Sequence, residues 1–415
     1  MKTFGLLLVV SVASLTAGSV VAQTWTQTSA PSNTWNSIAC SAGGNRLVAA
    51  AYHGGIWVST DSGSTWIQTS APQSGWLKVV SSADGTRLAA IGEPEPIGRL
   101  PPFSYTGSFY ASADSGATWI SNNVLSVPKG AKSSMVSSAD GRELVVLFSF
   151  GSFGSALFTS TNSGAAWRTN NLPNGNWLAL ASSADGTRLV AAGFGVAVST
   201  NSGSSWTSTN SLPVVAACVT LSADGSELIT IIGHQVFVST NLGMTWTQTS
   251  APATNWIALV SSADATRLTA LGGGNNGSFN PIPGPIYTST DTGATWSLND
   301  APVQYWTCAA ESADGSKLVA AAKGDAGLGP PGSTSGGGIW TSQTTPSPLL
   351  NITPSNTDLK LSWIAPSTNF VLRQSPDLFD WTVVTNPPVL NLSNLQNEVI
   401  LSPASDKGFY RLKTP

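Results

Sequence analysis

Short apolar runs of four to six residues follow one another along most of the chain, and turn-forming residues separate them. A typical pair is 76–80 (WLKVV) and 87–91 (RLAAI), with Asp84-Gly85 between the two runs. Runs of this length, bounded by Gly, Asp and Ser, are typical of β-strands joined by tight turns. The pattern therefore predicts an all-β protein built from many short strands.

Two turn motifs recur in phase with these runs. The first is the segment 59–66 (STDSGSTW), which recurs five more times at spacings of about 40 to 50 residues. Its third position is occupied by Asp61, Asp114, Asn162, Asn201, Asn241 and Asp291. The second motif, Ser-Ala-Asp-Gly, has its aspartate at Asp84, Asp140, Asp185, Asp224 and Asp314, with variants at 43–44 and 264–265. One repeat therefore contains four strands, named a to d, with the second motif between a and b. This spacing is that of propeller blades.

The two motifs differ in number, and the termini explain the difference. A seventh a–b pair is followed by one more c strand near 338–342, and no d strand follows it. Residues 24–31 (TWTQTSAP) repeat residues 245–252 letter for letter, so the missing d strand lies at the other end of the chain. We predict a seven-bladed β-propeller closed by pairing of residues 24–28 with residues 338–342, which leaves only short, protected strand edges.

The first motif, Ser-x-Asp-x-Gly-x-Thr-Trp, resembles the Asp-box or BNR repeat. It is similar to the repeats of sialidases, xyloglucan-degrading propellers, sortilin-type receptors and the photosystem II assembly-factor family. The resemblance covers residues 24–342. It implies a propeller fold and leaves the activity open. In physical terms the Asp or Asn side chain is expected to accept a backbone hydrogen bond two residues on, the Gly to take a left-handed conformation, and the Trp to fill a gap beside the blade. We interpret the six Asp and Asn positions as structural.

Composition limits the partners of the 415-residue chain. Only 9% of the residues are charged and the net charge is −3, so we expect no nucleic-acid partner. Residues 1–22 read as a secretory signal peptide, because an apolar run of about twelve residues ends in small residues. That run is too short to span a bilayer, so we expect no membrane span. An exported monomer is predicted, placed outside the cell, on its surface or in the periplasm. The three cysteines are interpreted as buried free thiols.

A binding site is expected on the face opposite the Asp-boxes, where the b–c connections lie. Three of these connections are long, at 93–106, 273–285 and 324–337, and blade 1 between them contributes its own b–c turn. Long loops on a rigid scaffold favour binding. The candidate ligand-binding residues are Tyr52, His53, Glu93, Glu95, Arg99, Phe103, Tyr105, Asn275, Asn276 and Asp325. The alternative is that the proline-rich loops only cap the channel.

Catalysis has few candidate residues. Glycoside hydrolysis needs two carboxylates about 5–10 Å apart, and Glu93 or Glu95 with Asp325 is the pairing available in the loops. Glu311 replaces a serine of the other repeats, and we interpret it as a channel-facing residue rather than a catalytic acid. The arginines of the a–b turns lie on the Asp-box side, where they cannot form a sialidase-type cluster. No catalytic residue, metal site or cofactor is assigned.

Residues 349–415 no longer follow the repeat. Strand-like runs at 359–363, 370–373, 381–384, 399–401 and 409–412 predict a small β-sandwich, joined to the propeller (23–345) by a proline-containing linker at 346–348. This segment resembles the C-terminal β modules of exported bacterial proteins, which implies a role in attachment or export. We predict a non-enzymatic propeller that binds a glycan or protein ligand. The alternatives are a polysaccharide-active glycoside hydrolase and a structural surface protein.

Overall fold

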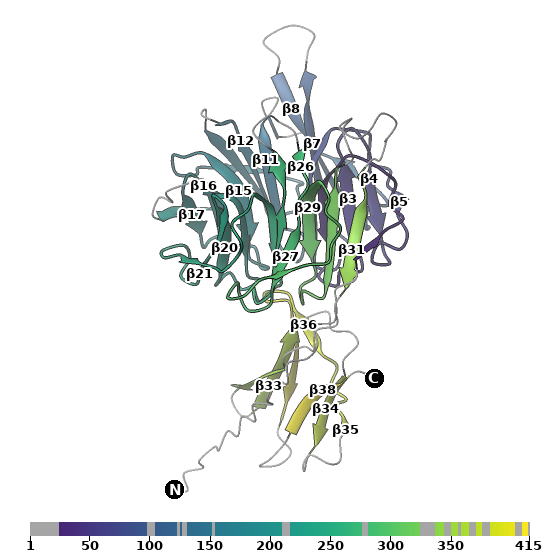
Figure 1. The fold of residues 1–415 in the computed structure, drawn as a ribbon, viewed down its shortest axis with the longest axis vertical. Helices are drawn as coiled ribbons and strands as arrows, with labels where there is room; N and C mark the ends of the chain where they lie inside the picture. The colour runs from purple at the N-terminus through teal and green to yellow at the C-terminus, as the bar shows by residue number, and fades with distance from the viewer. Residues whose placement is uncertain are drawn as a thin grey trace.

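The computed structural model describes residues 25–97, 104–122, 125–126, 131–151, 154–209, 216–275, 281–323, 337–343, 350–355, 358–364, 371–375, 382–402 and 409–413. Within these ranges the regular elements are β-strands, and seven antiparallel sheets are arranged around a common axis (Figure 1). The predicted seven-bladed propeller is therefore confirmed.

Each blade consists of four main strands, a to d. Blade 1 contains β2 (Trp35–Cys40), β3 (Leu47–Ala51), β4 (Ile56–Ser59) and β5 (Ile67–Gln68), and blade 2 contains β6 (Trp76–Ser81), β7 (Leu88–Ile97), β8 (Ser104–Ser112) and β9 (Ile120–Ser121), with β10 (Leu125–Ser126) also paired to β8. Blade 3 contains β11 (Lys132–Ser137), β12 (Leu144–Ser149), β13 (Ser155–Ser160) and β14 (Arg168–Asn170), and blade 4 contains β15 (Trp177–Ser182), β16 (Leu189–Gly193), β17 (Val196–Ser199) and β18 (Thr207–Thr209).

The other three blades follow the same plan. Blade 5 contains β19 (Ala216–Leu221), β20 (Leu228–Ile232), β21 (Gln235–Ser239) and β22 (Thr247–Gln248), and blade 6 contains β23 (Trp256–Ser261), β24 (Leu268–Gly272), β27 (Ile286–Ser289) and β28 (Ser297–Leu298). Blade 7 contains β29 (Trp306–Glu311), β30 (Lys317–Ala322), β31 (Ile339–Gln343) and, as its d strand, β1 (Trp25–Gln27) from the other end of the chain.

Pairing of β1 with β31 closes the ring. Trp25 lies opposite Ser342 and Gln27 opposite Trp340, which confirms the predicted pairing of 24–28 with 338–342. The Trp25 ring packs against the core between blades 6 and 7, and its Nε1 donates to Asn299 Oδ1 at 2.6 Å. The two chain ends are thus held by backbone pairing, apolar packing and a side-chain hydrogen bond together.

The hydrophobic core is divided into seven clusters, one at each interface between neighbouring blades. The b strands are buried along nearly their whole length, as in Leu47–Ala51 and Leu228–Ile232, because a blade is covered on both faces by its neighbours. The inner a strands also contact one another in sequence around the axis, from β2 through β29 and back to β2. Each blade is therefore stable only between two others.

The a–b turns form a closed belt of backbone hydrogen bonds around the axis. In each turn one alanine N–H donates to the carbonyl of the equivalent alanine in the next blade, at 2.6 to 2.9 Å. The last bond runs from Ala313 N to Ala42 O and closes the belt between blades 7 and 1. The seven alanines are Ala42, Ala83, Ala139, Ala184, Ala223, Ala263 and Ala313. The belt joins the blades near the axis, while β1 joins the ring at its outside.

The c–d turns have the repeated geometry expected from their sequence, with one correction. Asp61 Oδ1 accepts from Thr65 N at 2.9 Å, four residues on rather than the predicted two, and from Ser59 Oγ at 2.8 Å. Gly63 has a φ of +90°, as predicted, but Ser62 before it is also left-handed with a φ of +59°. The motif tryptophans, such as Trp66, pack on the interface with the preceding blade and fill the expected gap.

The long b–c connections differ from the predicted loops. In blade 2, β7 and β8 continue as a hairpin that projects beyond the rest of the propeller (Figure 1), with an irregular register between Gly92 and Glu95. In blade 6, β25 (Gly274–Asn275) and β26 (Pro281–Ile282) form a second small hairpin. The third connection, 324–336, lies outside the described residues. The described parts of two of the three predicted loops therefore contain strand.

The C-terminal residues form two more antiparallel sheets, as predicted for a small β-sandwich. One contains β32 (Asn351–Ser355), β33 (Asp358–Ile364), β37 (Gln396–Leu401) and β36 (Val389–Asn391), and the other contains β35 (Thr382–Val383), β34 (Val371–Ser375) and β38 (Phe409–Lys413). Leu361, Trp363 and Leu372 lie in the core between them. Figure 1 shows this sandwich at the end of the propeller opposite the β7–β8 hairpin.

Candidate functional site

Two predicted site residues from neighbouring blades meet on the b–c face. Tyr52, in the b–c turn of blade 1, donates its hydroxyl to Glu93 Oε1 of blade 2 at 2.6 Å. The His53 ring lies 4.0 Å from the Tyr52 ring, between centroids. Glu93 is fixed at the base of the β7–β8 hairpin, because its N–H donates to Gly75 O at 2.8 Å. We call Tyr52, His53 and Glu93 the Tyr–Glu cluster.

The Tyr–Glu cluster is accessible and its hydroxyl keeps its proton. Tyr52 and Glu93 are half-buried and His53 is exposed. The hydrogen bond to the Glu93 carboxylate raises the pKa of Tyr52, so the phenol remains a donor at neutral pH. His53 has a φ of +55°, an unfavourable conformation for a residue with a β-carbon. Strain of this kind is common where a side chain is held for binding.

The other predicted site residues are not joined to this cluster by described contacts. Glu95, Tyr105 and Asn275 are placed by their backbones in β7, β8 and β25. Four further candidates lie outside the described residues: Arg99, Phe103, Asn276 and Asp325. The separation of Glu93 or Glu95 from Asp325, on which a hydrolase assignment depends, thus stays a prediction.

A cavity of about 220 Å³ lies on the axis at the a–b turn face. It is lined by the ends of the inner strands and by the a–b turns of all seven blades, with Ser81, Ser137 and Ser182 in equivalent positions. Cys40 and Glu311 occupy the same position in blades 1 and 7. Leu395, from the C-terminal sandwich, also lines the cavity. The sequence did not predict this cavity, because its wall combines residues from every repeat and from the sandwich.

Glu311 is the exception in this wall. Its side chain is 1% exposed, and Arg267 Nε of blade 6 lies 3.2 Å from its Oε1, although neither carboxylate oxygen accepts a hydrogen bond of good geometry. Burial raises the pKa of Glu311 to about 8, and the positive Arg267 opposes this rise only in part. Replacement of a repeated serine by glutamate was the one sequence signal for this site. Glu311 is one of the residues that line the cavity, as predicted for a channel-facing position, but its side chain is buried and paired across a blade interface.

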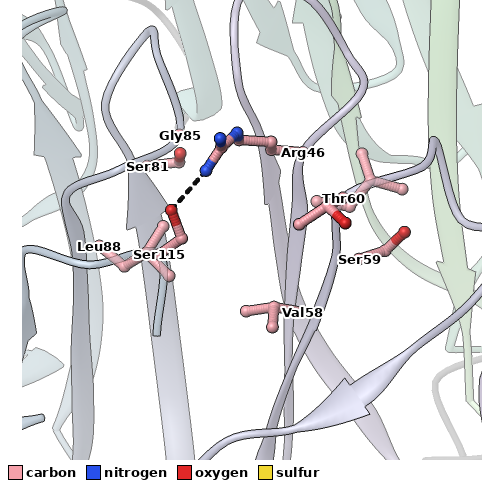
Figure 2. Close-up of a pocket in the computed structure, with 9 residues that line it drawn as sticks. Arg46, Val58, Ser59, Thr60, Ser81, Gly85, Leu88 and Ser115 are labelled. Carbon is pink, nitrogen blue, oxygen red and sulfur yellow. Dashed lines mark hydrogen bonds between the residues drawn. The ribbon is translucent and has the colours of Figure 1, made fainter. Parts of the chain in front are cut away.

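The basic residues of the a–b turns bridge neighbouring blades. Figure 2 shows Arg46 of blade 1 reaching Ser115 of blade 2, with Nη1 2.5 Å from Oγ. The space beside this bond is only about 10 Å³, room for a water molecule at most. Lys317 makes the equivalent bond to Ser62 Oγ at 3.0 Å, whereas Arg188 donates to Gly225 O in the next a–b turn at 3.1 Å. These side chains stabilise blade interfaces and do not converge on a substrate anion.

None of the three cysteines forms a disulfide. Burial raises the pKa of each thiol, and that of Cys40 reaches about 12. In the described part of the chain, no group of three or more His, Cys, Asp and Glu side chains is arranged to hold a metal ion. Over the same residues, no helix is long and apolar enough to cross a membrane.

Comparison with known proteins supports the fold. No family model matches the chain, and no curated protein matches it. Among solved structures, YCF48 bound to D1 peptide is similar with a TM-score of 0.54 and 14% identity, over 78% of this chain and 97% of that chain. YCF48 from Cyanidioschyzon merolae has a TM-score of 0.54 and 15% identity, over 77% and 98%. At such low identity the likeness shows a shared β-propeller fold only.

Proposed function

We propose that this protein is an exported, non-enzymatic propeller that binds a glycan or protein ligand through its b–c face. The hydrogen bond between Tyr52 and Glu93 carries the proposal, because it brings two residues of neighbouring blades together beneath a projecting hairpin. Beneath the pair the interface has an apolar core, and its other polar contacts, such as Arg46 with Ser115, lie away from the b–c face. A polar pair at an accessible loop surface is the usual place for recognition.

The chemistry of the Tyr–Glu cluster suits a neutral, hydrogen-bonding ligand. The Tyr52 and His53 rings offer apolar faces, and the Glu93 carboxylate accepts hydrogen bonds from sugar hydroxyls or peptide N–H groups. YCF48, which shares the fold, has been solved with a D1 peptide bound. That precedent supports a protein or peptide ligand for this chain, while the aromatic platform also suits a glycan.

The proposal also includes the identity of the c–d turns, the removal of a signal peptide and the division of the chain into domains. We take the c–d turns to be Asp-boxes, which is supported by the Ser59, Asp61 and Thr65 hydrogen bonds. Residues 1–22 would be removed on export, leaving the propeller (23–345), the linker (346–348) and the sandwich (349–415) as a monomer with neither cofactor nor metal. The apolar run before Gln23 supports the export step.

A panel experiment tests the function. Residues 23–415 are incubated with purified polysaccharides and with immobilised peptides, and both retention and soluble oligosaccharide release are scored. Selective retention without release is expected, and Tyr52→Phe should weaken it about five- to tenfold, since one hydrogen bond contributes about 1 kcal/mol. Tyr287→Phe, in the blade 5–6 core, is the matched control.

Other outcomes would contradict the proposal. Oligosaccharide release would favour the glycoside hydrolase, which the Glu93→Gln/Glu95→Gln/Asp325→Asn variant should then inactivate. Weak and uniform retention of every ligand would instead indicate a structural surface protein. Equal losses in Tyr52→Phe and Tyr287→Phe would remove the Tyr–Glu cluster from the binding site.

A further inference from the structure

The C-terminal sandwich places one residue at the axial cavity of the propeller. Of the residues that line the 220 Å³ cavity, Leu395 is the one that comes from the sandwich. It lies in the turn between β36 and β37, and Figure 1 shows β36 directed at the a–b turn face of the propeller. This face is opposite the Tyr–Glu cluster, so what happens here is separate from the proposed ligand site.

The turn that carries Leu395 is held by a dense set of hydrogen bonds. Asn391 Oδ1 accepts from Ser393 N at 2.9 Å, and Asn394 Oδ1 accepts from Gln396 N at 3.1 Å. Both asparagines also donate to Glu398 Oε1, which forms an ion pair with Lys360 at 2.7 Å. The turn therefore keeps its shape without help from the propeller.

Leu395 itself has a φ of +54°, a conformation that glycine or asparagine would adopt at lower cost. A leucine in the left-handed region costs about 1–2 kcal/mol relative to an unstrained backbone. Burial of the leucine side chain against the channel mouth is a gain that can offset this cost. The strained leucine therefore makes physical sense if its side chain is needed at the cavity.

The cavity wall also contains Glu311, an ionisable residue whose charge depends on its access to water. Glu311 faces Arg267 from the blade 6 turn, Asp314 from its own turn and Cys40 from β2, whose Sγ donates to the Glu311 carbonyl at 3.3 Å. The positive charge of Lys317 in β30 opposes the rise in the pKa of Cys40. Admission of water would favour the charged form of Glu311 and so lower its pKa from about 8. By linkage, loss of the Glu311 proton favours the open cavity.

We propose that the C-terminal sandwich is a reversible plug of the axial channel, seated through Leu395, and that ionisation of Glu311 weakens its seating. Below about pH 7 the plug is closed and Glu311 stays buried and neutral. At alkaline pH the charged Glu311 draws water into the cavity and the plug is released on its linker. The sandwich then controls access to the axial channel of its own propeller, in addition to any role in attachment.

Cys40 provides a built-in reporter, because it lines the cavity while the free thiols of Cys218 and Cys308 lie elsewhere on the inner strands. The full mature chain is treated with methyl methanethiosulfonate at pH 7, and modification of each cysteine is followed by mass spectrometry. Leu395→Gly removes the plug side chain and also relieves the left-handed strain, so the turn still folds. We expect Cys40 to react at least tenfold faster in Leu395→Gly, with Cys218 and Cys308 unchanged.

Leu392→Gly is the matched control, since Leu392 is exposed in the same turn and does not line the cavity. Unchanged Cys40 reactivity in Leu395→Gly, or equal acceleration in both variants, would overturn the plug. Acceleration of all three cysteines would mean general loosening of the propeller and would also count against it.

The pH dependence is tested by small-angle X-ray scattering, whose signal does not depend on thiol ionisation. The radius of gyration of the wild-type chain should rise between pH 6 and pH 9.5, and that of Glu311→Gln should not. A rise of the same size in Glu311→Gln would remove Glu311 from the mechanism. A constant radius in the wild type would show that the plug does not respond to pH.

Discussion

The two faces of the propeller are built in opposite ways. On the a–b turn face the same residues recur around the ring: an alanine in the hydrogen-bonded belt, a serine beside it and a basic side chain that reaches the next blade. On the b–c face the connections range from the short Gly193-Phe194-Gly195 turn to the β7–β8 hairpin. The connections on the b–c face therefore differ from one blade to the next.

This difference distinguishes residues with a structural role from candidates for a functional role. A residue type that occupies the same position in most blades performs a task that every blade needs, such as capping a turn or filling an interface. A residue that departs from its repeat has no such explanation. The Tyr52–Glu93 pair and Glu311 are departures of this kind, and each lies at an accessible cluster or a cavity.

Removal of the closing strand should lower the unfolding free energy most, because closure of the ring supports both faces of the propeller. Deletion of residues 23–30 removes the β1–β31 ladder and the Trp25 packing. We expect a loss of roughly 5 kcal/mol in unfolding free energy, since loss of a packed tryptophan alone costs about 3–5 kcal/mol. Urea denaturation should also become less cooperative. An unchanged transition would mean that the alanine belt closes the ring by itself.

Two glycines, one on each face, allow the tightness of packing on the two faces to be compared. Gly164 in a c–d turn and Gly233 in a b–c turn both have positive φ, +84° and +61°. A β-carbon at Gly164 would collide with the Phe109 ring, whereas one at Gly233 would meet nothing within 4 Å. Gly233→Ala should therefore cost about 1 kcal/mol from backbone strain. Gly164→Ala should cost about 2 kcal/mol more, from overpacking. Similar shifts in melting temperature would contradict the rigid packing of the c–d turns.

The single carboxylate in the cavity wall should give the wild-type protein an unusual pH dependence. Between pH 4.5 and about 8, Glu311 holds a proton in the folded state that it lacks in the unfolded state. Unfolding free energy therefore falls as pH rises through this range, by roughly 5 kcal/mol for this group, since each pH unit contributes about 1.4 kcal/mol. Urea unfolding at pH 5, 7 and 9 measures the slope, and Glu311→Gln should abolish its contribution. An equal slope in the variant would refute the shifted pKa.

The exposed aspartates of the c–d turns should show a smaller effect of the opposite sign. Hydrogen bonds from the Thr65 side chain and backbone lower the pKa of Asp61 to about 2. Its contribution is present above pH 4 and is lost as pH falls towards 2. Asp61→Ala should lower the melting temperature by a few degrees at pH 7. Asp61→Asn should be nearly neutral there, because Asn201 and Asn241 already make the same turn hydrogen bonds.

Most of the propeller could be predicted because its signals are local. Each strand and turn of a blade is specified within about 45 residues, and the repeat confirms each assignment several times. The closing strand could also be predicted, from the identity of residues 24–31 with residues 245–252. The β7–β8 hairpin could not, because Pro94 and Pro96 argue against a strand and do not show that pairing continues past the Gly92 irregularity.

The candidate site was predicted only in part, for a similar reason. Tyr52, His53 and Glu93 were named from their place in b–c connections, but their chain positions do not show that the hydroxyl and the carboxylate meet. Glu311 was noted as a departure from serine, whereas its partner Arg267 looked like every other turn arginine. Contacts between blades depend on how neighbouring sheets are rotated about the axis, and the period alone does not give that rotation.

The sequence by itself thus determined the blade count, the strand order, the closure and the turn chemistry, because each follows from short-range patterns repeated along the chain. The tertiary structure alone decided which of these residues come together: Tyr52 with Glu93 on one face, and Glu311 with Arg267 at the other, beside a cavity that Leu395 also lines. Each pair joins residues about 40 positions apart. Their distances are set by closure of the ring and docking of the sandwich, which no local pattern encodes.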